Sequence, residues 1–475
     1  MGKCKKFKTI KRGTMKIDIN KIKKIFEKYK ITQFKNDKEL SRWLKQLNKV
    51  QYNNLFKLTI NPQEIDFDHN LLINLNLLNC EDYEYRILGM SKIKGGSEIP
   101  HLFERLCSPT FLSNKNYYLD LALLAKTKYL RYCLWLIEEK FLNYKYHTED
   151  LSMVTKAKDE ITAQVLAEVA MNIHSMKSKH HKKDLEIISN CDSSMLQPTA
   201  MYPQCSVNNL ATNKVSLEDE YHLENMELLA TKKISKEYLY LLMTDKTIIN
   251  RKEYRREIYR LSKAKTKAKA RAIYYFIANP DRTCTHDFFD GMIDQDTGID
   301  YSLFDRSKCI RGVYNPRYNF YLKLLNEIDD RFVMYISYLL SNKYLLASGK
   351  LDSDIRFLLK ITNKDIFADL FYLAQNKNSL ESAYHEEDML IISRIEETKK
   401  RKLLLKIAID QNNLLSVNHQ YDMLFVSSLD LENFNEEELD KLYYYLFSTK
   451  GINHKEHISI LENIYQINEL KRKLK

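Results

Sequence analysis

A short pattern recurs along the chain at intervals of about 34 residues, and no other feature constrains the fold as strongly. The pattern runs from His or an aromatic residue, over two variable positions, to Asp or another polar residue, and then into an apolar run. Five clear copies read "KYHTEDL", "KHHKKDL", "EYHLENM", "AYHEEDM" and "VNHQYDM". A fixed period of this length is typical of repeat proteins, in which one small unit is stacked many times and buries its apolar surface against its neighbours.

The Asp position of the pattern provides a register for the whole array. Successive positions lie 30 to 41 residues apart, except for one interval of 64 residues, which we interpret as two repeats with a degenerate copy near 276–318. The sequence therefore predicts roughly twelve repeats over residues 70–465. The register falls on Arg86, Asp120, Asp150, Asp184, Asn225, Glu257, Tyr321, Asp354, Asp388, Asp422 and His457.

Each repeat contains two apolar segments with helical spacing. In residues 160–172, for example, Ile161, Val165, Leu166 and Val169 share one helix face. The chain has only 10 Gly and 7 Pro, so the residues that favour tight turns are scarce. We expect an all-α fold of helix–turn–helix repeats. Several second helices end at an Asn, which tolerates the left-handed conformation of a helix C-terminus; these are Asn172, Asn279 and Asn376.

The histidines of the pattern raise the question of a metal site, because "HHKKD" contains His180, His181 and Asp184. Other repeats have Tyr or Leu351 in place of the second His, and a metal ligand does not tolerate such a replacement. We therefore interpret the pattern as structural. The Asp near the helix start accepts from backbone N–H groups, and the ring packs on the next repeat. The motif comprises Asp120, His147, Asp150, His181, Asp184, His222, Asn225, His385, Asp388, His419 and Asp422, with His454 as a sixth histidine.

This layout resembles the α-solenoid class, in which helical units such as tetratricopeptide and HEAT repeats stack into a superhelix. The fixed Trp, Gly-Tyr, Ala and Pro positions of tetratricopeptide units are not present, so the resemblance is one of architecture. It implies an α-solenoid of roughly twelve helix–turn–helix repeats with an N-terminal helical cap. We expect a disordered basic tail over 1–16, the cap over 17–69, the array over 70–465 and a basic C-terminal end over 466–475.

The formal net charge of +12 is unevenly distributed, and residues 251–275 carry ten basic and two acidic side chains. These basic residues can contact an anionic partner, although a solvated helix face is the simpler interpretation. A protein that reads RNA bases would repeat its basic and stacking positions in every unit, whereas here the charge is concentrated in one. The candidate contacts are Arg251, Arg255, Arg256, Arg260, Lys263, Lys265, Lys267, Lys269 and Arg271.

Two further motifs fall within 276–318. The stretch "DQDTGID" (294–300) resembles the start of a calcium loop, but Ile299 stands where that loop needs Gly. The stretch "RTCTH" (282–286) is similar to an Arg-and-His signature of some helical ribonucleases, with too few residues between Arg and His. No nucleophile elbow, phosphate-binding loop or zinc-protease motif is present. We therefore predict no catalytic residue, cofactor or metal.

The leading hypothesis is a non-catalytic helical-repeat protein that binds a protein or peptide partner along its concave surface. The alternative is a solenoid that binds nucleic acid through residues 251–271, and a third reading is an enzyme with a site in 276–318. Scattered cysteines without a CxxC pair, and the lack of an apolar run of about 18 residues, predict a cytoplasmic protein with no membrane span. The sequence does not indicate the oligomeric state.

Overall fold

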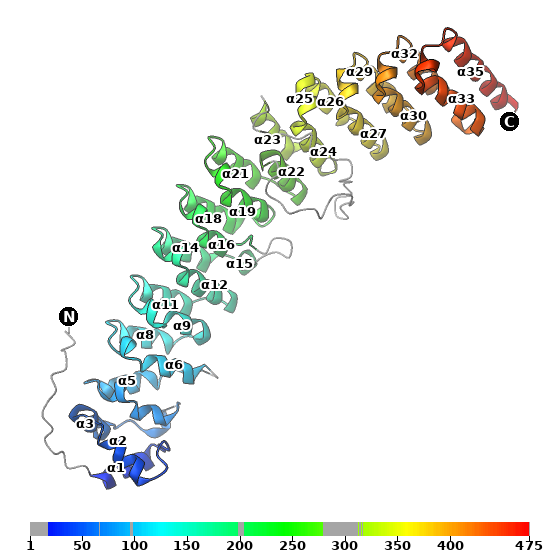
Figure 1. The fold of residues 1–475 in the computed structure, drawn as a ribbon. Helices are drawn as coiled ribbons and strands as arrows, with labels where there is room; N and C mark the ends of the chain where they lie inside the picture. The colour runs from blue at the N-terminus through cyan, green and yellow to red at the C-terminus, as the bar shows by residue number, and fades with distance from the viewer. Residues whose placement is uncertain are drawn as a thin grey trace. The chain divides into compact units, whose positions relative to one another are not determined.

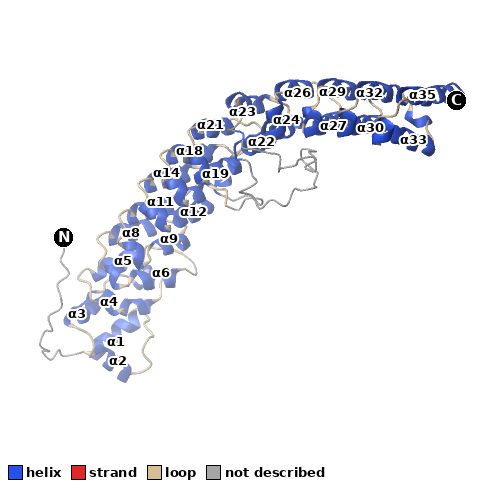
Figure 2. Cartoon of the chain, turned by 45° about the horizontal axis from the view of Figure 1, so that its top comes forward, coloured by secondary structure: helices blue, strands red, loops and turns tan. Residues whose placement is uncertain are grey.

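The computed structural model describes residues 18–65, 67–95, 98–197, 204–278, 312, 315 and 317–474. All regular secondary structure in these residues is helical, so the predicted all-α fold is confirmed (Figures 1 and 2). The chain divides into two compact units, residues 1–233 and 234–475. We call them the N-terminal half and the C-terminal half, and we describe each by itself.

The N-terminal half begins with α1 to α3 and two short 3-10 helices, in the region predicted as a cap. Helix α3 contacts both α1 and α5, so these first helices pack on the start of the array. The helices are α1 (Ile19–Lys28), α2 (Asp37–Leu44), α3 (Lys49–Lys57), α4 (Leu75–Leu78), α5 (Tyr83–Met90), α6 (Ile99–Leu106), α7 (Pro109–Leu112), α8 (Tyr117–Leu124), α9 (Leu130–Leu136), α10 (Glu139–Leu142), α11 (His147–Thr155), α12 (Glu160–Met171), α13 (Ile173–Lys177), α14 (His181–Asn190), α15 (Ser193–Leu196), α16 (Val207–Thr212), α17 (Lys214–Leu217) and α18 (His222–Thr231).

The C-terminal half continues with helices of the same kinds. They are α19 (Lys236–Thr244), α20 (Lys246–Ile249), α21 (Tyr254–Ser262), α22 (Lys267–Ala278), α23 (Tyr318–Glu327), α24 (Asp330–Ser341), α25 (Lys343–Ser348), α26 (Leu351–Leu358), α27 (Lys364–Ala374), α28 (Lys377–Glu381), α29 (His385–Ser393), α30 (Thr398–Ile409), α31 (Gln411–Leu414), α32 (His419–Ser428), α33 (Glu436–Phe447), α34 (Thr449–Ile452) and α35 (His457–Leu474).

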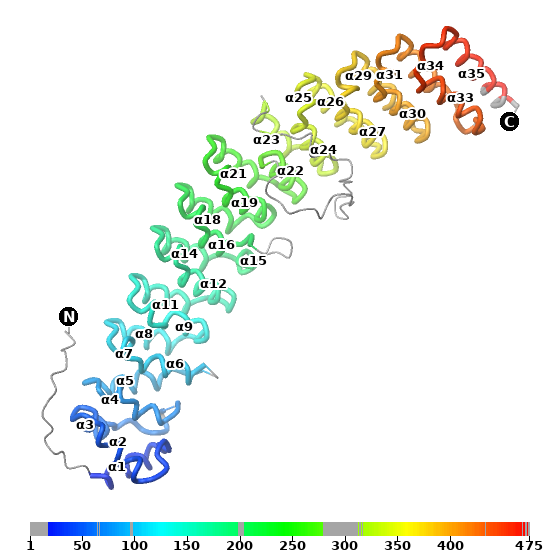
Figure 3. Tube along the Cα trace, viewed as in Figure 1, coloured from blue at the N-terminus to red at the C-terminus, as the bar shows by residue number. Residues whose placement is uncertain are grey.

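Three helices recur in the same order in most groups of both halves (Figure 3). A helix of about one turn comes first, a middle helix that starts at His, Tyr or Leu follows, and a third helix completes the group. In the exceptions, the short helix α15 stands between α14 and α16, and the described residues before α23 contain no short helix. The sequence predicted only two helices in each repeat, because a single turn is too short to show a helical period. The middle helices are α5, α8, α11, α14, α18, α21, α23, α26, α29, α32 and α35.

Within each half, helices of the same kind in neighbouring groups pack against each other. In the N-terminal half each middle helix contacts the next, from α5 through α8, α11 and α14 to α18, and α9, α12 and α16 form a parallel row of contacts. The core lies between these rows, where Leu124, Leu151, Val154 and Leu166 have no exposed surface. Each such side chain contributes about 1.5–3 kcal/mol by its removal from water.

The Asn residues at the ends of the third helices do not act as predicted. Asn172 has φ −74° and ψ 125°, which is an extended conformation and not a left-handed one. Its side chain accepts from the backbone N–H groups of His174 and Ser175 at 2.9 and 3.2 Å, so it caps the start of short helix α13. Asn376 caps α28 through Ser379 N–H in the same way, and Asn279 lies outside the described residues. These Asn residues therefore begin the next group, with a cap worth about 1 kcal/mol each.

The cap residue keeps a constant distance from the middle helix. Asn172 precedes His181 by nine residues, and Asn376 precedes His385 by nine. Nine residues also separate the equivalent cap from the first residue of the middle helix in other groups, with caps at Asn74, Ser108, Asn213, Asp245, Asn342, Asp410 and Ser448. This spacing provides a sharper register than the Asp position.

Helices α21 and α22 pack directly against α23 and α24. Helix α22 contacts α24, and α21 contacts α23. The Ser337 hydroxyl donates to the Ala272 carbonyl at 2.7 Å, and Asn326 donates to the Arg260 carbonyl at 3.0 Å. The packing leaves no room for another helix pair between these two groups. The degenerate copy predicted near 276–318 falls largely outside the described residues.

Candidate functional site

Each histidine of the pattern is the first residue of a middle helix, and each aspartate is the fourth. This placement directs the His Nε2 atom to the carboxylate of the preceding middle helix. His181 Nε2 lies 3.1 Å from an Asp150 oxygen, and His222 Nε2 lies 3.0 Å from an Asp184 oxygen. We call the six such pairs the histidine ladder; the other four are His147–Asp120, His385–Asp354, His419–Asp388 and His457–Asp422, at 2.8–3.2 Å.

The ladder is buried throughout. Every His and Asp side chain in the six pairs is at most 4% exposed. A carboxylate removed from water needs a hydrogen-bond donor, and each histidine supplies one from the next group of helices. The ladder therefore couples successive middle helices within each half.

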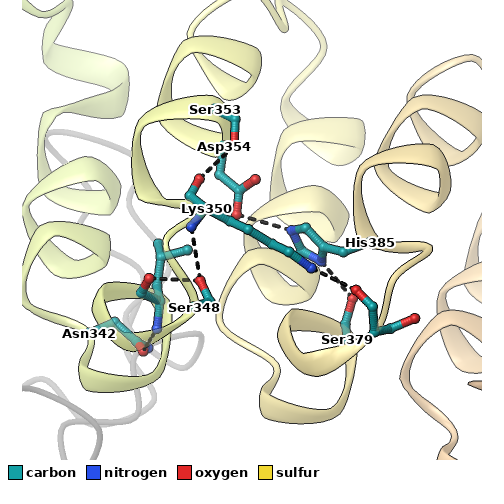
Figure 4. A network of polar contacts seen from close by, with 9 residues as sticks. Asn342, Ser348, Lys350, Ser353, Asp354, Ser379 and His385 are labelled. Carbon is teal, nitrogen blue, oxygen red and sulfur yellow. Dashed lines mark hydrogen bonds and ion pairs between the residues drawn. The ribbon is translucent and has the colours of Figure 1, made fainter.

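The short helix positions a second hydrogen bond on the other imidazole nitrogen. The Ser175 hydroxyl lies 2.9 Å from His181 Nδ1, and the Ser379 hydroxyl lies 2.8 Å from His385 Nδ1 (Figure 4). Ser216 makes the same contact with His222 at 2.9 Å. The three hydrogen-bonded Ser–His–Asp sets have the composition of a hydrolase triad, but the serines have no exposed surface. Substrate cannot reach these hydroxyls, so the sets are structural.

Two details of the predicted motif are wrong. Asp150 and Asp388 bond to the histidine of the next middle helix, whereas the sequence reading assigned them to N–H groups of their own helices. The register of the last copy is also shifted by three residues. His457, and not His454, begins α35 and lies 2.8 Å from Asp422, while His454 is exposed before the helix.

His181 and Asp184, which suggested a metal site in the sequence, belong to two different pairs of the ladder. His181 bonds to Asp150, and Asp184 bonds to His222. His180 is buried with its ring 5.1 Å from the His222 ring, and burial lowers the pKa of its imidazole. Among the described residues, no cluster of three or more His, Cys, Asp or Glu side chains is placed to hold a metal ion.

Repeats that lack His or Asp use other side chains at the same place. The Tyr318 hydroxyl, at the start of α23, donates to a Glu257 oxygen on α21 at 2.6 Å. Both residues are longer than the His and Asp that they replace. In the N-terminal half the Arg86 guanidinium lies 4.1 Å from the Tyr117 ring centre, which is a cation–π contact. Asn225, the register residue of α18, donates to Asp219 at 2.8 Å.

Burial and histidine act in opposite directions on the ladder carboxylates. Burial raises the pKa values of Asp150, Asp388 and Asp422, and the hydrogen bond from the partner histidine partly offsets this rise. At the C-terminal end, the bond to Asp422 raises the pKa of His457 even though burial alone would lower it.

The predicted basic contacts lie on α21, on α22 and in the loop between these helices, except for Arg251, which lies between α20 and α21. Three of them are engaged within the fold: Arg251 donates to the Ile277 carbonyl at 3.1 Å, Lys269 pairs with Asp330 at 3.6 Å, and Arg271 donates to the Tyr238 hydroxyl at 2.9 Å. Arg260 is partly buried, and the exposed members are Arg255, Arg256, Lys263, Lys265 and Lys267. The surface available to an anionic partner is therefore smaller than the sequence suggested.

The exposed sides of the first middle helices carry apolar residues. At the third helix position, Tyr85 of α5 is 72% exposed and Leu119 of α8 is 53% exposed. A groove of about 430 Å³ opens between α8 and α11. Its apolar lining comes from Leu119, Leu123, Tyr146 and Met153, and its polar edge includes Glu149, Lys156 and Lys182. The sequence did not predict this surface, because the recurring motif consists of residues that are buried in the fold.

The calcium-like loop at 294–300 and the "RTCTH" stretch fall outside the described residues. Cys107 and Cys133 are buried, and burial raises the pKa of each thiol to about 12. Within the described part of the chain, no helix combines the length and the apolar character that crossing a membrane requires.

Comparison of the chain with protein-family models, with curated proteins and with solved structures found no match in any of the three.

Proposed function

We propose that the chain is a helical-repeat protein of the α-solenoid type that acts by binding a protein partner and not by catalysis. The partner contacts the exposed sides of α5, α8 and α11. We call this surface the apolar face; it comprises Tyr85, Leu88, Tyr118, Leu119, Leu123 and Met153. The recurring order of short, middle and third helices supports the repeat architecture. The buried cysteines are consistent with the reducing cytoplasm as the site of action.

The proposal rests on a change from apolar to charged residues at one exposed position that the middle helices share. The third residue of the middle helix is Tyr85 in α5 and Leu119 in α8, but Lys183 in α14 and Glu224 in α18. All four residues are exposed. Exposed apolar side chains gathered on neighbouring helices are typical of interaction sites, whereas scattered ones are not. The equivalent residue of α11 is the exposed Glu149, so the apolar third position is confined to α5 and α8. This contrast indicates that α5 and α8 carry a requirement that α14 and α18 do not, and α11 contributes Met153 from its other exposed side.

The groove between α8 and α11 suits an amphipathic segment of a partner protein. Leu119, Leu123 and Met153 can receive apolar anchors, and Lys156 and Lys182 at the edge favour acidic residues beside those anchors. Repeat proteins commonly use a row of helices in this way, because successive groups present the same face repeatedly.

Affinity capture with matched variants tests the proposal. The tagged chain is used to capture proteins from its native cells after nuclease treatment, alongside the variant Leu119→Glu with Met153→Glu. The control is Ile187→Glu with Leu223→Glu, which adds the same charge to the neighbouring groove between α14 and α18. We expect one partner that the wild type and the control retain and the first variant loses. Equal retention by all three proteins, or equal loss from both variants, would overturn the proposal.

A further inference from the structure

Three successive loops in the N-terminal half each contain two lysines in the same arrangement. Each loop joins a middle helix to the third helix of its group, and each contains the sequence Lys-x-Lys. The pairs are Lys92 and Lys94 after α5, Lys126 and Lys128 after α8, and Lys156 and Lys158 after α11. Because α5, α8 and α11 contact one another in turn, the three pairs stand side by side. We call this set the lysine row.

In the first two loops, the residue between the lysines explains why both ammonium groups face water. Ile93 has no exposed surface, and Thr127 is 8% exposed, with its hydroxyl accepting from the Tyr129 N–H at 3.0 Å. The central side chain therefore anchors the loop to the core, and the two flanking side chains point outward. All six lysines are exposed.

A structural role accounts for only one lysine of each pair. Lys92, Lys126 and Lys156 lie within two residues of the last residue of a middle helix and interact favourably with the negative end of its dipole. Lys94 and Lys128 lie four residues beyond the last helical residue, and the dipole effect is confined to the final turn. Lys94 and Lys128 thus need another explanation.

The second lysines line one shared groove of about 600 Å³, together with Arg131. Two of its three acidic residues are engaged within the fold: Asp159 caps α12 by accepting from the Thr162 N–H at 2.7 Å, and Glu160 accepts from the Tyr132 hydroxyl at 3.0 Å. The third, Glu98, is partly exposed. Lys158 donates to the Cys191 carbonyl. Lys94, Lys128 and Arg131 are exposed like charges beside this one groove. They repel one another, and an anion bound among them would relieve that repulsion.

We propose that the lysine row binds the phosphate backbone of a nucleic acid strand. The lysines stand at three successive loops, which suits an extended polyanion better than a single phosphate group. The groove has no exposed ring for base stacking, since Tyr129 and Tyr132 are 7% and 6% exposed, so binding is independent of sequence. Its lining also lacks an exposed apolar pocket of the kind that anchors a peptide. Lys263 and Lys265 repeat the motif in the C-terminal half.

Fluorescence anisotropy with a labelled oligothymidylate of about 30 nucleotides tests the proposal between about 0.05 and 0.2 M salt. The test variant carries Lys94→Glu, Lys126→Glu and Lys128→Glu. The control carries Lys115→Glu, Lys145→Glu and Lys179→Glu, which are exposed lysines before the middle helices and give the same net charge. Matching circular dichroism spectra and melting curves establish that both variants fold.

We expect the wild type and the control to bind with a steep salt dependence, and the test variant to bind at least about tenfold more weakly with a salt slope smaller by about 2. No binding by the wild type at the lowest salt, or equal weakening in the control, would overturn the proposal. A polyglutamate competitor that displaces the oligonucleotide as well as unlabelled oligothymidylate does would point to an acidic protein and would also overturn it. Lys94, Lys126 and Lys128 do not line the groove between α8 and α11, and the test variant leaves Lys156 unchanged, so this test can fail while the protein-partner proposal stands.

Discussion

Middle helices α8 and α14 are alike on the buried side and unlike on the exposed side. Asp120 of α8 and Asp184 of α14 each accept a hydrogen bond from the histidine of the next middle helix. The third residue of the helix is the half-exposed Leu119 in α8 and the exposed Lys183 in α14. The buried side sets where a helix lies, and the exposed side sets what it can bind. Changes on the two sides should therefore separate stability from binding.

The largest effect should follow the loss of a ladder carboxylate. Asp184→Ala leaves the buried His222 without its acceptor, and breaking one partner of a buried pair costs about 3 kcal/mol of unfolding free energy. Urea denaturation followed by circular dichroism measures the loss. The control is Glu186→Ala on the same helix, which is partly exposed and should cost less than about 0.5 kcal/mol. Similar losses in the two variants would mean that the ladder contributes little.

A smaller effect should follow the loss of the serine that contacts the imidazole. Ser379→Ala removes the 2.8 Å contact with His385 Nδ1 and should cost about 1 kcal/mol. Ser353→Ala on α26 removes an exposed hydroxyl that donates to its own helix and serves as the control. Hydrogen exchange of α28 and α29 reports the change locally. Unchanged protection of these helices in Ser379→Ala would contradict the assigned role.

The last pair of the ladder should depend on pH. The folded state raises the pKa of His457, so its stabilisation is complete below the unfolded imidazole value of about 6.5 and is lost as the pH rises through the folded pKa. The raised pKa of Asp422 acts in the same direction from about pH 4 upward. The loss of stability in His457→Gln should therefore be larger at pH 6 than at pH 8. Melting curves at the two pH values check this, and a larger loss at pH 8 would contradict it.

The exposed side should show the smallest effect on stability. Leu119→Glu places a charge on a side chain that is already 53% exposed, so the unfolding free energy should change by less than about 0.5 kcal/mol. The same change should abolish partner capture. A destabilisation as large as that of Asp184→Ala would place Leu119 with the core residues, and the two sides of the helix would then not be separable.

The sequence predicted the helical class, but it did not predict which residues of the recurring motif bond to one another. The period of His181 and Asp184 is visible in the sequence, whereas their partners, Asp150 and His222, lie in different copies 31 and 38 residues away. A hydrogen bond between two copies of the motif and a hydrogen bond within one copy produce the same periodic sequence, so the period alone does not identify the partners. The serine that contacts His181 was missed because Ser175 lies in a helix of only five residues.

The sequence did not predict the lysine row or the apolar face, for a different reason. It predicted an anionic contact at 251–271 because the basic residues there are contiguous, yet Arg251, Lys269 and Arg271 are engaged within the fold. The lysine row is dispersed over residues 92–158 and becomes a surface only when three loops come together. Both the lysine row and the apolar face are visible in the sequence when equivalent exposed positions of successive middle helices and of the loops after them are compared.

The central claim is that the histidine ladder joins successive middle helices, and a double-mutant cycle on Asp150 and His181 tests it most directly. The free energy of unfolding is measured for the wild type, Asp150→Ala, His181→Ala and the double variant. The two side chains lie 3.1 Å apart in a buried site, so the losses should not add, and the coupling free energy should be about 2 kcal/mol. Losses that add to within about 0.5 kcal/mol would contradict the account.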